Sequence, residues 1–153
     1  MDTPPDRHAL TSEESAALLR ARIITGALMS GIATFMVVAS FLVTRGSIGN
    51  TLPAAAHNFL HVALIGAFGV VLASPYVGRA AARNARTGIE AFFLDLVVKE
   101  AMREGVGLAG IVFAMLAGHL EWIVAFGALS LVAMAWGWPR AEGLRNASRE
   151  RRA

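Results

Sequence analysis

Four stretches of the chain are largely apolar, and most charged residues lie between or outside them. The first, 23–44, contains no charged residue, and a helix of about 20 residues can cross the ~30 Å hydrocarbon core of a bilayer. An ionised side chain at the centre of such a helix costs about 2.5–3.5 kcal/mol on insertion scales. The four expected spans are 23–44, 58–77, 101–118 and 120–138. They predict an all-α fold, a bundle of four transmembrane helices built from two hairpins.

The segments outside the spans divide the chain into three parts. Residues 1–22 form an N-terminal segment in which Thr11 and Glu14 have the spacing of a capping box, so we expect a short helix there. Residues 23–138 form the membrane domain, and residues 139–153 form a basic tail. The third and fourth spans have almost no connection between them, so they must form a tight antiparallel hairpin.

Residues 87–104, just before the third span, have the pattern of an amphipathic helix. Apolar residues recur there at spacings of three and four, while charged residues occupy the other faces. We expect a helix that lies along the cytoplasmic surface or docks on the bundle and then turns into the third span. Asp95 and Lys99 are four apart with the acid first, the favourable order for an ion pair. A helix that binds a partner protein is the alternative, but charges of both signs favour an interfacial helix.

The basic residues indicate how the bundle is oriented. Only Arg45 lies in a loop on the expected outer side, and all the others lie in the two terminal segments or in the second connection. These others are Arg7, Arg20, Arg22, Arg79, Arg83, Arg86, Lys99, Arg103, Arg140, Arg145, Arg149, Arg151 and Arg152. Because cytoplasmic loops carry an excess of lysine and arginine, both termini are expected in the cytoplasm.

Composition excludes several classes of function. Apolar residues make up 56% of the 153 residues, and the mean hydropathy is +0.55, which is too apolar for an ordinary soluble domain. The net charge of +3 does not indicate a nucleic-acid partner, because the arginines sit at the ends of apolar runs. The absence of cysteine excludes thiol chemistry. No nucleotide-binding loop and no catalytic serine, histidine and aspartate set is apparent, so we expect a protein that is not an enzyme.

Small residues suggest how the spans pack, because they let helix backbones approach closely in lipid. The candidates for helix packing are Gly26, Ser30, Gly31, Gly105 and Ala109. Residues 27–32 also align with residues 101–106, and apolar residues further along the two spans align at the same offset. Spans one and three are therefore expected to pack near the bundle centre as the first helices of two related hairpins; a chance match is the alternative.

Several short motifs resemble a set of small, uncharacterised four-span bacterial membrane proteins. They are REGVGLAG at 103–110, AGH at 117–119, RII at 22–24 and WPR at 138–140. The resemblance covers most of the chain and implies a multi-pass protein of the bacterial inner (plasma) membrane. It implies no activity.

The third span on its own is similar to the carboxylate helix of the proteolipid (c) subunit of rotary ATPases. The matching residue is Glu104, next to Arg103, among small residues. The resemblance implies a membrane carboxylate that carries protons, since burial favours the neutral form. The charges upstream place Glu104 near the cytoplasmic boundary instead, where pairing with Arg22 or Arg103 is the structural alternative.

Three histidines and one glutamate are expected on the outer side. His57 and His61 are four apart on one helical face, and the topology brings His119 and Glu121 to the same surface. Such a set can bind a divalent metal, and His61 can serve as an axial haem ligand. Interfacial polar groups without a ligand are the alternative.

Three functions therefore stay open. The first is a non-enzymatic accessory, assembly or oligomerising subunit without a cofactor, whose partners are the bilayer and either further copies or a larger membrane complex. The second is a proton- or ion-handling subunit that uses Glu104. The third is a metal- or haem-binding protein that uses His57, His61 and His119.

Overall fold

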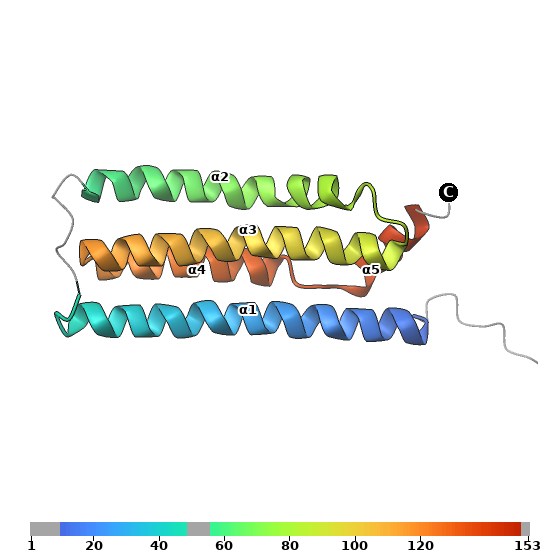
Figure 1. Ribbon diagram of the computed structural model, residues 1–153, viewed down its shortest axis with the longest axis horizontal. Coiled ribbons are helices and arrows are strands. Elements are labelled where there is room, and N and C mark those ends of the chain that lie inside the picture. Colours follow the sequence, from blue (N-terminus) through green and yellow to red (C-terminus); the bar gives the residue numbers. More distant parts are fainter. Residues whose placement is uncertain (1–9, 49–55, 151–153) are drawn as a thin grey trace, which may run out of the picture.

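The computed structural model describes residues 10–48 and 56–150, and the regular structure in these ranges is entirely helical. The helices are α1 (Ser12–Thr44), α2 (Ala56–Ala82), α3 (Gly88–Ala117), α4 (Leu120–Trp136) and α5 (Ala141–Glu150). Figure 1 shows α1 to α4 running along one common axis in alternating directions, with α5 at the end where α1 begins. The prediction of an all-α fold is confirmed.

The first helix begins where its capping residues predict. The Glu14 amide donates to Thr11 Oγ1 (3.2 Å), and the Thr11 amide donates to Glu14 Oε2 (3.0 Å). The helix then continues without a break for 33 residues, or about 50 Å at 1.5 Å per residue. About 30 Å suffices to cross a bilayer core. About one third of α1 is therefore not needed to cross it, and the N-terminal part of the helix extends beyond the expected span.

Residues 87–104 do not form a separate surface helix that turns into a span. They are the first half of α3, which begins where Thr87 Oγ1 accepts from the Glu90 amide (3.1 Å). Between residues 89 and 104 there is no glycine or proline, so nothing interrupts the helix. The apolar face packs inside the protein: Phe92 and Leu96 are buried in a small cluster with residues of α1 and α5.

The interior is divided into a long core and a short one. The long core lies among α1 to α4 and includes Ile32, Leu60, Ile111 and Phe126. The short core lies at the α5 end and is made by Ala17, Leu18, Ala21, Phe92, Leu96 and Leu144. The N-terminal part of α1 therefore packs against α3 and α5 in the short core.

Only one of the two expected hairpins is a packed pair. Helices α3 and α4 are joined by Gly118 and His119, and Gly118 has the left-handed φ of 76° that ends a helix with glycine. In the described ranges α1 and α2 make no contact with each other, whereas α3 contacts all four other helices. The connection 45–55 is long enough to let α1 and α2 separate, so each packs on the α3–α4 pair instead.

Two helix ends differ from the sequence prediction. The second helix continues past Pro75 to Ala82, beyond the expected 58–77. The fourth ends at Trp136 rather than at 138, and residues 141–150 of the expected tail form α5. Pro139 cannot continue the α4 hydrogen-bonding pattern, and α5 forms because it buries Leu144 completely.

Two helices are long and apolar enough to cross a membrane, α1 and residues 58–82 of α2. The pair α4 and α5, bent by 62° at the break, adds a third if both are counted as one span. Helix α3 carries Glu100, Arg103 and Glu104 near its middle. These two or three helices indicate a membrane protein.

Candidate functional site: a buried ion pair beside a charged cavity

An ion pair is buried on α3. Arg103 Nη1 donates to Glu100 Oε1 at 2.9 Å, and the two residues are 6% and 0% exposed. A buried carboxylate loses its hydration, so a cation one helical turn away is needed to stabilise its charge. Glu100 Oε2 is also buried and has no hydrogen-bond partner among the described residues.

The α2 side of this pair is built around a proline. Pro75 has no N–H to donate to the carbonyl oxygen of Val71, four residues earlier. The Ser74 hydroxyl donates to that oxygen instead (2.8 Å), and Ser74 Oγ accepts from Arg103 Nε (3.1 Å). The serine thus satisfies the backbone group that proline frees and holds the guanidinium of α3.

The α4 side approaches closely at two points. Ser130 Oγ donates to the carbonyl oxygen of Arg103 (2.8 Å), next to Gly107, where an added Cβ would lie 2.7 Å from Ser130 Cβ. After α4, a Cβ on Gly137 would collide with Arg103 Nη1 and lie 3.1 Å from Glu100 Oε1. A larger residue at 137 would therefore push the Arg103 guanidinium out of its present position.

A cavity of about 670 Å³ lies on the other side of Gly137. Its walls come from the end of α2, the first half of α3, the turn 136–140 and α5. The charged residues in these walls are Arg79, Arg83, Asp95, Lys99, Arg140, Glu142 and Glu150. Gly137 lines the cavity and also lies against the buried pair, so the two features are neighbours, although neither Glu100 nor Arg103 lines the cavity.

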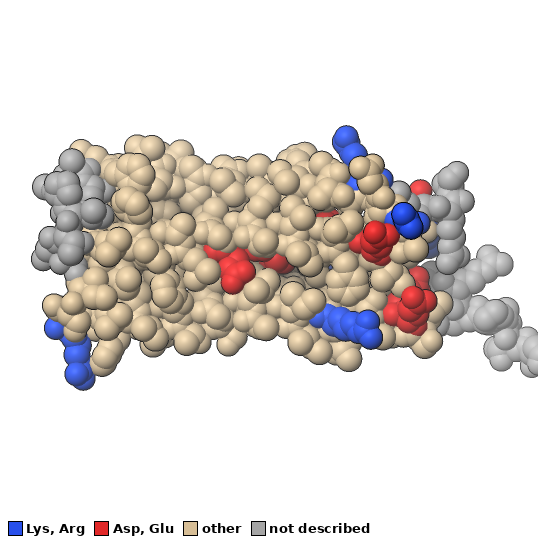
Figure 2. Space-filling model, in the orientation of Figure 1, with Lys and Arg blue, Asp and Glu red and all other residues tan. Residues whose placement is uncertain are grey.

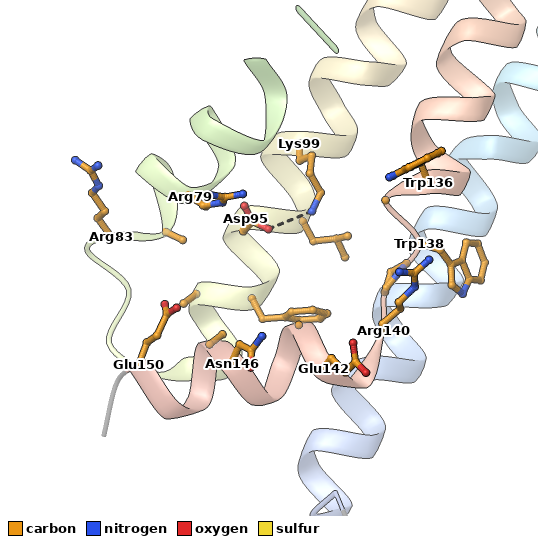
Figure 3. Close-up of a pocket in the computed structure, with 18 residues that line it drawn as sticks. Arg79, Arg83, Asp95, Lys99, Trp136, Trp138, Arg140, Glu142, Asn146 and Glu150 are labelled. Atoms are coloured by element: carbon orange, nitrogen blue, oxygen red, sulfur yellow. Dashed lines mark hydrogen bonds and ion pairs between the residues drawn. The ribbon is translucent and has the colours of Figure 1, made fainter. Parts of the chain in front are cut away.

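Figure 3 shows from which helices the charged side chains enter the cavity. Arg79 on α2 and Lys99 on α3 lie toward the bundle, and Glu142 and Glu150 lie along α5. Lys99 Nζ binds Asp95 Oδ2 at 3.1 Å, so the predicted ion pair is confirmed. A Cβ at Gly78 would lie 2.6 Å from Asp95 Oδ1, so α2 and α3 also approach closely here.

Glu104 does not have the surroundings that were expected. Arg103 pairs with Glu100 instead, and Arg22 Nε donates to the carbonyl oxygen of Pro139 (3.3 Å). Glu104 is partly buried and lies 13 residues before the α3 C-terminus, about 20 Å along the helix. Both proposed partners are therefore engaged elsewhere.

The residues expected to mediate packing face outward. Ser30, Gly31, Gly105 and Ala109 are exposed, and a Cβ on Gly31 or Gly105 would meet nothing within 4 Å. Gly26 is half-buried, with only Trp138 at 4.0 Å from an added Cβ. Close contacts occur instead at Gly107, Gly110 and Gly127. Helices α1 and α3 do pack on each other as expected, but not through the small residues that were named for it.

The outer histidines do not form the expected cluster in the part of the chain that the structure describes. His119 Nδ1 and Glu121 Oε1 are 2.9 Å apart, whereas the His61 ring packs edge-on against Trp122, with centroids 4.6 Å apart. No three described histidine or carboxylate side chains are grouped as a metal site. The side chain of His57 lies outside the described residues.

Sequence reasoning identified Arg103 but missed Glu100, Ser74 and Gly137. The signals were present: an acid and a base three residues apart within a largely apolar segment, and a serine directly before a helical proline. No family model, curated protein or solved structure matches the chain.

Proposed function

We propose that this chain is a four-span integral membrane protein without a catalytic role, which works as an accessory or assembly subunit or by self-association. The observation that carries the proposal is the apolar outer surface of the long helices. Large side chains exposed there include Val37 (65%), Phe41 (52%), Ile65 (74%), Phe68 (53%) and Val132 (63%). Figure 2 shows one face of the bundle on which uncharged residues cover most of the length, with an acidic patch near mid-length and most other charged side chains near one end. Such a surface is suited to lipid or to another apolar helix.

In this proposal α3 and α4 supply the third and fourth spans. Glu100 and Arg103 of α3 are buried and satisfy each other, so these two charges need not face hydrocarbon, whereas Glu104 is partly exposed. Trp136 and Trp138 follow the apolar part of α4, and indole rings favour the headgroup level. The end that holds α5 is then cytoplasmic, and Arg45 lies on the outer side.

Single cysteines test this topology, because the chain has none of its own. We expect a membrane-impermeant maleimide to label Ser47→Cys in intact cells, while Ser15→Cys and Arg149→Cys react only after permeabilisation. All three parent residues are exposed, so poor reactivity of the last two would not come from burial. Labelling of Ser15→Cys and Ser47→Cys from the same side would contradict the proposal.

A subunit role is tested by purification in a mild detergent. We expect further copies of this chain, or a second membrane protein, to co-elute in stoichiometric amounts and to be cross-linked before extraction. Ser30→Trp on the exposed small-residue face of α1 should reduce that association, with Leu72→Trp on exposed α2 as the control. A monodisperse single chain with no cross-linked species would contradict the role.

A further inference from the structure

We propose that the exposed face of α3 around Glu104 binds a transmembrane helix of a different membrane protein, and that this helix carries a lysine or arginine at the depth of Glu104. The inference rests on the proposed function and names the kind of partner that the chain binds. Three features carry it: the missing partner of the Glu104 carboxyl group, its depth in a four-span topology, and the small residues beside it.

The Glu104 side chain makes no hydrogen bond or ion pair with any residue that the structure describes. The two cations expected nearby, Arg103 and Arg22, are engaged with other groups. The side chain is only partly buried, so part of it faces the surroundings of the bundle. Ionised or neutral, a carboxyl group that faces lipid without a hydrogen-bond partner is unfavourable, and a polar group on a neighbouring helix can satisfy it.

The depth of Glu104 follows from its place on α3. It lies 13 residues before the end of the helix at Ala117, about 20 Å along the axis. With the Gly118 turn at the outer boundary of a ~30 Å core, the carboxyl group is about 10 Å inside the cytoplasmic boundary. Figure 2 shows an acidic patch near mid-length with uncharged residues around it. A partner cation is at this depth when it lies about seven residues from the cytoplasmic end of its own span.

The surface beside Glu104 consists of small residues. Ala101, Gly105 and Ala109 follow one another at four-residue spacing and are all exposed, and a Cβ on Gly105 would meet nothing within 4 Å. Figure 1 shows α3 between α1 and α2, which do not contact each other in the described ranges. Because small residues let helix backbones approach closely in lipid, a partner helix can come near enough for its cation to reach Glu104.

A second copy of this chain does not supply the cation. Copies related by an axis along the membrane normal keep each residue at the same depth. Arg103 is the only lysine or arginine within the four predicted spans, and it is 6% exposed and bound to Glu100. Lys99 lies about 7 Å nearer the cytoplasm and binds Asp95. Two copies that met at this face would also bring two Glu104 carboxyl groups together, which disfavours the charge on both.

Synthetic transmembrane peptides test the inference, because they take the place of the partner helix. The peptides have about 22 leucine and alanine residues with uncharged ends, and they differ only at the seventh residue, which is lysine, glutamate or leucine. Each peptide carries a fluorescent acceptor, and the full chain in phosphatidylcholine vesicles carries a donor on Ser47→Cys. We expect the lysine peptide to bind about fivefold more tightly than the leucine peptide, as one polar contact between membrane helices does. The glutamate peptide should bind no better than the leucine peptide.

Two pairs of variants locate the contact. Glu104→Leu should abolish the preference for lysine, whereas Glu121→Leu, in the first turn of α4, should keep it. Ala109→Phe should weaken the binding of every peptide by about threefold, because the ring covers the small-residue surface. Its matched control is Ala128→Phe, because Ala128 is also exposed but lies on α4, which runs behind α3 in Figure 1.

Equal binding of the lysine and leucine peptides by the wild-type chain would overturn the inference. A lysine preference that survives Glu104→Leu would do the same, and so would equal losses in Ala109→Phe and Ala128→Phe. Energy transfer between labelled copies of this chain that disappears in Glu104→Leu would assign the face to a second copy instead. A chain that stays in solution without detergent would overturn the proposed function as well, whereas a detergent-dependent chain that binds all peptides alike overturns only this inference.

Discussion

At the scale of single residues, the buried charges of α3 stabilise the fold only as a pair. Glu100 and Arg103 neutralise each other at 2.9 Å, and Ser74 adds a hydrogen bond to the guanidinium. Removing one member leaves the other charged, buried and without compensation. Removing both leaves a space that an apolar side chain can fill, so the two changes are not additive.

We predict that Arg103→Met and Glu100→Met each lower the free energy of unfolding by about 3–5 kcal/mol, because each leaves one buried charge. The double variant should be less destabilised than either single variant. Unfolding in detergent, followed by circular dichroism, measures all four proteins of this cycle. Additive losses would show that the two side chains do not interact energetically.

A second prediction at this scale concerns Gly137. Gly137→Ala should lower the free energy of unfolding by about 1–3 kcal/mol, because the new methyl group meets Arg103 and Glu100 in a packed interior. Gly105→Ala is the matched control: its Cβ has open space within a helix, so it should be neutral or stabilise by about 0.5–1 kcal/mol. Thermal unfolding of both variants in the same detergent and buffer measures the two changes in stability. An equal change in the two variants would refute the steric explanation for Gly137.

Which residues the sequence could predict depends on the distance over which they interact. Thr11 with Glu14 and Asp95 with Lys99 were predicted correctly, because helical geometry alone brings them together. Gly105 was predicted to pack, but Gly107 does. The rotation of α3 about its own axis decides between the two, and only its contacts with the other helices determine that rotation.

At the scale of elements, α5 and the first halves of α1 and α3 form a small core beyond the long one. Leu144 is fully buried there, and Ser148 Oγ donates to Glu14 Oε1 at 3.3 Å. We predict that Leu144→Ala costs about 2–5 kcal/mol and raises hydrogen exchange in α5. The control is Leu19→Ala, whose side chain is 60% exposed and whose loss should cost less than about 0.5 kcal/mol. Unchanged exchange in α5 would mean that this helix does not depend on the contact.

The elements themselves were easier to predict than their ends. Long apolar runs mark α1, α2 and α4 because no other structure satisfies so many backbone groups without water. The division of α3 into a surface helix and a span was wrong, because charged residues were taken to mark a boundary. In the structure α3 runs through them without a break, and Glu100 and Arg103 are buried. Pro75 likewise does not end α2, because the Ser74 hydroxyl donates to the carbonyl oxygen that proline leaves without a donor.

At the scale of the whole molecule, an apolar layer separates the buried Glu100–Arg103 pair from the Gly118 turn. Among the described residues, the core of this layer is formed by apolar side chains such as Ile111, Ile123 and Phe126. A proton path needs polar groups on both sides of a carboxylate, and these side chains supply none.

We therefore predict that liposomes containing the protein show no proton flux above protein-free liposomes, and that Glu104→Gln changes nothing. A pH-sensitive dye inside the liposomes measures the flux after a potential is applied. Flux that disappears in Glu104→Gln but persists in Glu121→Gln would instead assign proton transfer to Glu104.

The turn of Gly118 and His119 has a consequence for biosynthesis. In the four-span proposal, α3 carries the ionisable side chains Glu100, Arg103 and Glu104 near its middle and inserts poorly on its own, whereas α4 carries only Glu121, in its first turn. Because only Gly118 and His119 join the two helices, we expect α3 and α4 to enter the bilayer together as one helical hairpin. Insertion of α3 would then follow the synthesis of α4, and α4 would shield the Glu100–Arg103 pair as the hairpin enters.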